Sequence, residues 1–579
     1  MIFRYSKKFI NFLLATCFLC YLPTTNLKAQ EKKTKNKFKI SGNLSVSQEF
    51  FSYNSNDSLY RPYRPESVTR FMGSTSFSYG KFSLPFSIAY TLQQGTAEYN
   101  SPIPTTFSWS DLLNYYNQLS LSPTYKSFQG FIGTQIPKYS ELTCGDLPVF
   151  GLGFNWKPKK FRAAAFYGNS QRGVSTDTLL RVPGSYQRTS YGAKLGIGLE
   201  DSTHLYLIAL FHKDDPNSAV VKSQGVSSKE NVVISVDQMY WIAKRIFFKL
   251  ETAISAFSPD LKDASLESDS FKLNVPSFLT SLYTPRYTSN YGVAGSSGIG
   301  YVAKKWSIRG KMRLFSPDYK TLSYPFLQND RLEWTIEPKF SLFKSRINID
   351  GSYGKRTDNL FKNKLATAYQ DLLSANLNLQ ITKSWNFNAT YSNFGIRNTI
   401  SNDTFRLQNS SQNLGLSSSY NIVGKKFGHT FMAAWTQDQF VDYNIVSGGQ
   451  MNNQTKVYIL GYSLALVEKP LSISLNGTYF ENNLAVGKVN FKMLSLSESY
   501  VFGKKKNINA SLSQNYQITS LEPFEPDENI NVTTSLSYTV AKGLNLGTTG
   551  SLVFFKYGSA KPGVQNRENS IRITASYSF

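Results

Sequence analysis

Apolar and polar residues alternate along most of this sequence, and that alternation limits the possible folds more than any other feature. The segment 570–579 reads Ser-Ile-Arg-Ile-Thr-Ala-Ser-Tyr-Ser-Phe, so that every second residue is apolar or aromatic. The same pattern recurs at 191–199, 306–314, 346–353 and 471–479. Because successive side chains of a β-strand point to opposite sides, each segment predicts a strand with one apolar and one polar face.

Two architectures accommodate such strands: a soluble sandwich, which hides the apolar faces between two sheets, and a membrane barrel, which turns them toward lipid. The polar faces carry Lys, Arg, Asn and Ser even in the middle of the segments, which argues against a second core. Aromatic residues near the predicted strand ends, Trp241, Trp306, Trp385 and Tyr353, are typical of interfacial girdles. Amphipathic helical windows are almost absent. We therefore predict an all-β fold, a single large transmembrane antiparallel β-barrel.

The alternating segments predict about 26 strands (24 to 28) between residues 38 and 579. Short, Lys-rich connections such as 80–81, 304–305 and 425–426 separate pairs of strands. The longer connections between them include 94–114, 137–148, 171–187, 212–228, 258–287 and 520–529. Strict alternation of short turns and long loops is typical of outer-membrane barrels, with the turns in the periplasm and the loops outside. It predicts that both termini are periplasmic.

The N-terminal residues 1–29 have the layout of a secretory signal peptide: a basic start, an apolar stretch from Phe9 to Leu22, and a small-residue cleavage site before Gln30. Lipid attachment at Cys17 and an uncleaved helical anchor are the alternatives. After cleavage, residues 30–37 form a short basic periplasmic segment. Cleavage would also leave Cys144 as the remaining thiol, and a bystander role is its simplest interpretation.

At this point residues 38–579 resemble a bacterial outer-membrane β-barrel protein. Tyr577 and the terminal Phe579 look like the C-terminal signal that the barrel-assembly machinery reads during biogenesis. The Ala29-Gln30 junction and the Asn, Tyr and Lys content look like barrels from the Bacteroidota. TonB-dependent receptors and the lipopolysaccharide-translocating barrel fit poorly, because a plug domain, a periplasmic domain and paired cysteines are not recognisable here. The resemblance implies the outer membrane as location, and the lipid bilayer and the assembly machinery as partners.

A barrel of this size is wide enough to hold an aqueous lumen. The alternation predicts a set of ionic side chains that line it: Arg162, Lys194, Lys249, Glu251, Arg309, Lys311, Arg313, Arg346 and Asp350, with Arg572 on the last strand. Rings of such residues set ion selectivity, and the cluster of Arg309, Lys311 and Arg313 would favour anions. The alternative is that these side chains only hydrate the wall and pair with acidic neighbours.

Long loops are candidates to fill this lumen. The longest, 258–287, contains an apolar and aromatic section at 276–285, and the segment 101–116 contains Phe107, Trp109, Leu112 and Leu113. We expect both to fold inward, with capping of the outer mouth as the alternative.

Catalytic and cofactor chemistry has little support in the sequence. The histidines at 204, 212 and 429 have no motif around them, and no P-loop, zinc spacing or dinucleotide fingerprint is present. We predict no enzymatic activity, no cofactor and no metal site.

The formal net charge of +25, from 63 Lys and Arg against 38 Asp and Glu, at first suggests a nucleic-acid partner. Most of the excess, however, lies in the short turns and in residues 30–37. It therefore predicts a basic periplasmic rim near anionic headgroups and no nucleic-acid partner.

Two functions fit these expectations. The first is a channel or porin-like transport protein of the outer membrane. The second is a structural, assembly or secretion component that docks periplasmic or surface protein partners.

Overall fold

The computed structural model describes residues 38–60, 64–94, 118–176, 178, 183–266, 283–402, 404–447, 449–467, 469–485, 487–503, 507–559 and 561–579. The regular elements within these ranges are β-strands. No helix among the described residues has the length and apolar character needed to cross a membrane. The predicted signal peptide (1–29) and basic segment (30–37) lie outside the described residues.

The first half of the chain forms the strands β1 (Phe38–Ser55), β2 (Ser67–Tyr79), β3 (Phe82–Gln94), β4 (Gln118–Leu121), β5 (Thr124–Tyr125), β6 (Phe128–Gln135), β7 (Val149–Trp156), β8 (Phe161–Gln171), β9 (Gln187–Gly198), β10 (His204–Asp215), β11 (Glu230–Ile242), β12 (Ile246–Ser258), β13 (Asn290–Val302) and β14 (Trp306–Phe315). The second half forms β15 (Arg331–Leu342), β16 (Ile347–Asp358), β17 (Ala368–Gln380), β18 (Trp385–Asn398), β19 (Gln408–Val423), β20 (Phe427–Asp442), β21 (Asn453–Leu466), β22 (Leu471–Leu484), β23 (Gly487–Phe502), β24 (Ile508–Leu521), β25 (Asp527–Ala541), β26 (Leu544–Lys556) and β27 (Gln565–Ser578).

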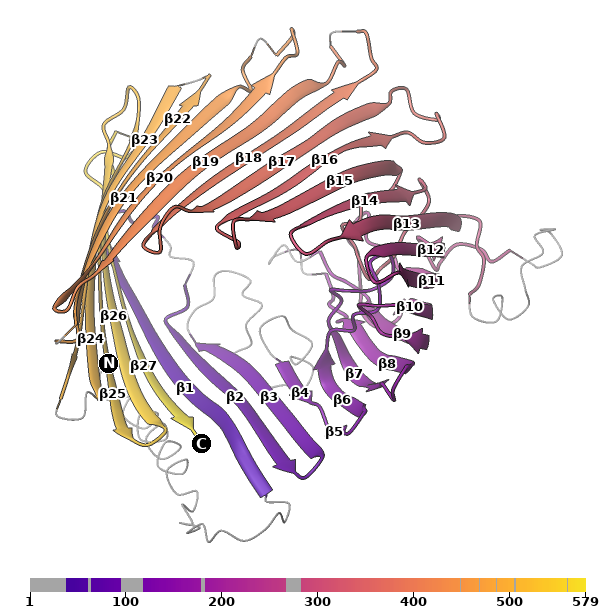
Figure 1. The fold of residues 1–579 in the computed structure, drawn as a ribbon, viewed down its shortest axis with the longest axis horizontal. Coiled ribbons are helices and arrows are strands. Elements are labelled where there is room, and N and C mark those ends of the chain that lie inside the picture. The colour runs from indigo at the N-terminus through magenta and orange to yellow at the C-terminus, as the bar shows by residue number, and fades with distance from the viewer. Residues whose placement is uncertain are drawn as a thin grey trace.

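These strands form one closed antiparallel sheet (Figure 1). Each strand pairs with its neighbours in the chain, and β1 pairs with β27 from Asn43–Ser578 to Ser55–Asn566, which closes the ring. The last residue joins this closure, because the backbone N–H of Phe579 donates to the carbonyl of Gly42 at 3.1 Å, and the N–H of Gly42 donates back at 3.0 Å.

The segments β4 and β5 are two halves of a single strand, because both pair with β3 on one side and with β6 on the other. Pro123 lies at the break between them and has no N–H to donate to a neighbouring strand. The barrel therefore has 26 strands, and the predicted fold class is confirmed.

Short and long connections alternate around the ring, as predicted, with two exceptions, of which 522–526 between β24 and β25 is only as long as the turn 199–203. The loop 485–486 between β22 and β23 is as short as a turn, although it lies on the side of the long loops. Here β22 and β23 pair as a hairpin up to Leu484 and Gly487, so the residues that would form a long loop belong to the strands instead.

The two faces of the sheet differ in character. Large apolar side chains lie exposed on one face, for example Leu460 (69 %) in β21 and Leu494 (54 %) in β23. Directly paired residues on neighbouring strands share a face. Pairing across β14 to β21 links Lys311 to Asn453, so these residues share one face, on which Leu372, Phe394 and Phe440 interrupt the polar residues. Of the aromatic residues predicted at strand ends, Trp241, Trp306 and Trp385 lie there, whereas Tyr353 lies in the middle of β16.

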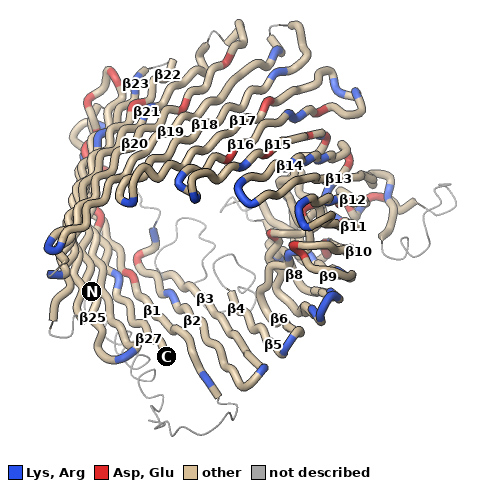
Figure 2. Tube along the Cα trace, viewed as in Figure 1, with Lys and Arg blue, Asp and Glu red and all other residues tan. Residues whose placement is uncertain are grey.

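Lys and Arg gather at the short turns (Figure 2). Lys81, Lys126, Lys244, Lys305 and Lys426 each lie in a connection of this kind. The positive charge predicted for one rim is therefore a feature of the folded barrel.

Candidate functional site

Two loops fold against the inner face of the barrel wall, where Figure 1 shows coil segments gathered beside β8 to β13. They are the β6–β7 loop (136–148) and the β14–β15 loop (316–330), which we call together the inner cluster. Its apolar side chains form one buried core with the wall: Tyr139, Leu142, Cys144, Leu147 and Tyr319 from the loops, and Val149, Phe166, Ile208, Leu210, Val233, Ala253, Ala294 and Phe315 from the strands. This is a packed core inside the ring, in addition to the sheet itself.

The two loops also bond to each other. The hydroxyl of Tyr319 donates to the carbonyl of Leu142 at 2.7 Å, and the hydroxyl of Tyr324 donates to the carbonyl of Ser140 at 3.3 Å. Gly292 in β13 permits the close approach of the second loop, since a Cβ atom there would lie 2.1 Å from the backbone nitrogen of Tyr319. The loops therefore dock on the wall as one unit.

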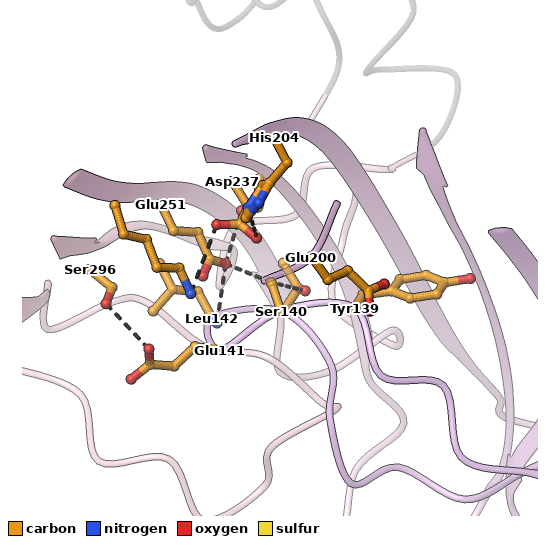
Figure 3. Close-up of polar contacts among 12 residues, drawn as sticks. Tyr139, Ser140, Glu141, Leu142, Glu200, His204, Asp237, Glu251 and Ser296 are labelled. Carbon is orange, nitrogen blue, oxygen red and sulfur yellow. Dashed lines mark hydrogen bonds and ion pairs between the residues drawn. The ribbon is translucent and has the colours of Figure 1, made fainter. Parts of the chain in front are cut away.

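Glu251 of β12 anchors the first loop. Its side chain is fully buried, and its Oε1 accepts hydrogen bonds from the hydroxyl of Ser140 (2.6 Å), the N–H of Leu142 (3.2 Å) and the hydroxyl of Ser235 (3.1 Å). All three donors meet at Oε1, whereas Oε2 is buried without a donor among the described residues, so the bonds to Oε1 are the ones that hold the loop where it lies. Figure 3 shows Glu251 directed at the 139–142 segment.

Asn231 and His212 anchor the second loop. The amide of Asn231 donates to the carbonyl of Lys320 at 3.1 Å, and its Oδ1 accepts from the N–H of Leu322 at 3.0 Å. The buried His212 ring lies between two hydroxyls, with Nδ1 2.7 Å from Ser190 and Nε2 2.9 Å from Ser323. This histidine thus has a structural role in the inner cluster.

A cavity of about 430 Å³ lies beside the first loop and is lined by groups of both signs. Lys194 of β9 donates to the carbonyl of Tyr139 at 2.9 Å, and its Nζ lies 4.3 Å from the centre of the Tyr206 ring. Asp237 Oδ2 lies 3.4 Å from His204 Nε2, and its Oδ1 lies 4.0 Å from Lys249 Nζ (Figure 3). Three of the predicted lumen residues, Lys194, Lys249 and Glu251, therefore meet around the first loop.

The basic residues of β14 have partners. Lys311 pairs with Glu337 at 3.0 Å. Arg313 pairs with Glu141 of the first loop at 3.1 Å and also with Glu333. The guanidinium of Arg309 lies 5.8 Å from the centre of the Phe247 ring. These contacts favour the paired, charge-balanced alternative over an anion-selective cluster at this strand.

The other predicted residues lie apart from this group. Arg162 donates to the carbonyls of Lys159 (3.0 Å) and Phe161 (2.8 Å). Arg346 lies in the turn before β16, and Asp350 pairs with Lys339 at 3.2 Å.

Two further predicted groups lie near the closure of the ring. Arg572 pairs with Glu49 of β1 at 2.6 Å. Tyr577 and Phe579 have ring centres 5.6 Å apart at the end of β27.

The loops predicted to fold inward can be followed only in part. The segment 101–116 and the centre of 258–287 lie outside the described residues, although Tyr283 is buried and its hydroxyl lies 2.8 Å from that of Ser258. The loops that form the inner cluster were not predicted to do so. Apolar residues within 316–330, such as Leu322 and Leu327, were the signal in the sequence that this loop is buried, because a loop surrounded by water is usually polar.

Burial changes the acidity of the loop side chains. It raises the pKa of the Cys144 thiol to about 11 and raises the pKa of Tyr139 and Tyr319 above the ordinary value. These groups stay neutral in the folded loops. Within the described ranges, no group of three or more His, Cys, Asp and Glu residues is arranged to hold a metal ion.

No protein-family model matches the sequence, and no curated protein sequence is similar to it. Solved structures align along most of the chain at low similarity. The P pilus usher (PapC) translocation pore aligns with a TM-score of 0.37 at 11 % identity, over 94 % of this chain and 99 % of that chain. The copper transporter OprC aligns with a TM-score of 0.39 at 9 % identity, over 95 % and 82 % of the two chains. The ferric preacinetobactin receptor BauA from Acinetobacter baumannii aligns with a TM-score of 0.36 at 10 % identity, over 93 % and 80 %. Similarity at this level assigns neither a family nor a function to the chain.

Proposed function

We propose that the protein is an outer-membrane channel for small solutes, whose water-filled lumen is narrowed on one side by the inner cluster. The location follows from physical chemistry: a closed sheet that exposes large apolar side chains on one face needs lipid around it. In this proposal residues 1–29 are a signal peptide, both termini are periplasmic, and Tyr577 and Phe579 serve barrel assembly.

One observation carries the channel proposal. Seven residues with hydroxyl side chains are direct cross-strand partners on successive strands from β20 to β26. We call them the hydroxyl row: Thr430, Ser463, Ser474, Ser497, Ser513, Thr533 and Ser551. All seven are half-buried, and the same strands expose Leu460 and Leu494 on the other face. The inner cluster lies along β8 to β13, across the ring from these strands (Figure 1). A polar wall that lies apart from the described inner loops supports an aqueous path.

The test is electrical recording in planar lipid bilayers with the purified chain from residue 30. We expect stable conductance steps. Replacing Ser497, Ser513 and Thr533 by Asp should shift the reversal potential in a KCl gradient toward cations, because rings of carboxylates select for them. A matched triple Asn variant should leave the reversal potential unchanged.

Inserted protein that conducts no ions would contradict the channel and leave the docking or secretion role as the better account. Conductance with no shift in the Asp variant would show that the hydroxyl row does not face the conducting path.

A further inference from the structure

A second and larger cavity, of about 570 Å³, lies between the β6–β7 loop and the wall formed by β4 and β6 to β9. It adjoins the first cavity, since Lys138, Tyr139, Lys194 and Glu200 line both. Its size lies within the range of small-molecule sites, which occupy about 300–1,000 Å³.

The charge around this cavity is strongly unbalanced. Four cationic side chains line it, those of Lys138, Lys157, Arg162 and Lys194, against the single carboxylate of Glu200. Glu200 Oε1 lies 3.7 Å from Lys157 Nζ and 3.6 Å from Lys194 Nζ, so one carboxylate serves two ammonium groups.

The other two cations of the lining lack such a partner. Among the described residues no carboxylate lies within ion-pair distance of Arg162 or Lys138, and the guanidinium of Arg162 bonds only to main-chain carbonyls. The structure thus concentrates positive charge that the protein itself does not neutralise.

The rest of the lining is apolar or hydrogen-bonding. Phe131 and Phe166 contribute rings, and Ala164 contributes a small apolar side chain. The side-chain Nε2 of Gln135 is buried without a hydrogen-bond acceptor among the described residues, and it belongs to the same lining. A ligand that satisfies this surface carries a hydrogen-bond-accepting anion at one end and an apolar body at the other.

We propose that this cavity binds amphipathic organic anions, namely carboxylates with an aromatic or short aliphatic body. As a statement about the solute that passes, the inference rests on the proposed channel function. As a statement about binding, it rests on the cavity alone.

Equilibrium binding in detergent at low salt tests the site, with 4-phenylbutyrate as the probe and 4-phenylbutanamide as its neutral counterpart. We expect the carboxylate to bind at least tenfold more tightly than the amide. Arg162→Gln should weaken carboxylate binding several-fold, and Glu200→Gln should strengthen it, because the competing negative charge is gone. Neither change removes a buried contact of the inner cluster.

The matched control is Lys339→Gln, which removes a lysine of β15 that does not line the cavity. It should leave the affinity unchanged. Equal binding of carboxylate and amide, or weaker carboxylate binding in Glu200→Gln, would overturn the proposal.

The binding and electrical measurements test the two proposals separately, so either proposal can fail without the other. A silent bilayer with selective carboxylate binding contradicts the channel and keeps the site. A conducting barrel that does not distinguish the two probes keeps the channel and removes the site.

Discussion

At the scale of single residues, Glu251 is the most informative side chain. It is a fully buried carboxylate on a wall strand, and its donors come from the β6–β7 loop and from the neighbouring strand β11. An apolar residue would be cheaper to bury, but it would leave the N–H of Leu142 and the hydroxyl of Ser235 without their acceptor. Glu251 therefore couples the loop to the barrel.

Replacing Glu251 by Ala should loosen the β6–β7 loop. Each buried donor left without an acceptor costs about 1–3 kcal/mol. A tenfold change in an opening equilibrium corresponds to about 1.4 kcal/mol, so Cys144 should react with a maleimide at least about tenfold faster in the variant. Glu251→Gln keeps a carbonyl acceptor and is the control, with a smaller increase. Equal rates in wild type and Glu251→Ala would show that the carboxylate does not hold the loop.

The thiol of Cys144 makes the stability of the folded protein depend on pH. Burial raises the pKa of its thiol to about 11, above the value of about 8.5 for a free thiol. The folded state therefore keeps the proton when the unfolded chain loses it, so this stabilisation is complete below about pH 8.5 and declines as the pH rises toward 11.

The melting temperature should consequently fall more steeply between pH 8 and pH 10 in the wild type than in Cys144→Ala. The comparison of the two proteins contains its own control, because every other titrating group is present in both. Parallel pH profiles would contradict the buried, neutral thiol.

The strand face of Lys311 and Arg313 could be predicted from the sequence, but their partners could not. Alternation places Lys311 and Arg313 on the polar face of β14, and that is where they lie. Their partners, Glu337 on β15 and Glu141 on the β6–β7 loop, follow from register and from loop docking. Neither register nor docking is expressed in a local pattern.

At the scale of elements, the interrupted strand β4–β5 is the weakest part of the sheet. β4 pairs with β3 over four positions and with β6 over two, whereas β19 pairs with β20 along almost their full length. Fewer backbone hydrogen bonds allow local opening at lower free energy.

Hydrogen exchange in detergent should therefore be faster in the backbone of 118–125 than in that of 408–423. Mass spectrometry of proteolytic peptides resolves the two segments within one experiment, so the second serves as an internal standard. Equal protection of both segments would show that the break at Pro123 is not a weak point.

The strands themselves could be predicted well from the sequence, because a two-residue period is a local signal that the β-barrel must satisfy on every strand. The inner cluster could not be predicted in this way. Its loops are far apart in the sequence and have no period, and their burial depends on contacts such as that between Tyr319 and Leu142. The shortest exception to alternating turns and loops, 485–486, arises because hairpin pairing continues to the end of β22.

At the scale of the whole molecule, the distribution of basic residues distinguishes the rim of short turns from the rim of long loops. Lys and Arg gather at the short turns (Figure 2), where we expect anionic phospholipid headgroups of the periplasmic leaflet to attract them by about 1 kcal/mol each. This rim sets the orientation that we propose.

An epitope tag inserted in the long loop 359–367 should bind antibody on intact cells. The same tag in the short turn 303–305 should bind only after the outer membrane is permeabilised. The reverse pattern would mean that the barrel is inserted the other way up.

The central claim is that water lines one face of this barrel and lipid the other. The direct measurement is the reactivity of single cysteines, introduced into Cys144→Ala protein in liposomes, toward a charged, membrane-impermeant thiol reagent. The account predicts rapid modification at Ser497→Cys and Ser513→Cys in the hydroxyl row, and protection at Leu460→Cys and Leu494→Cys on the opposite face. Protection of the two hydroxyl-row positions, or modification of the two leucine positions, would contradict it.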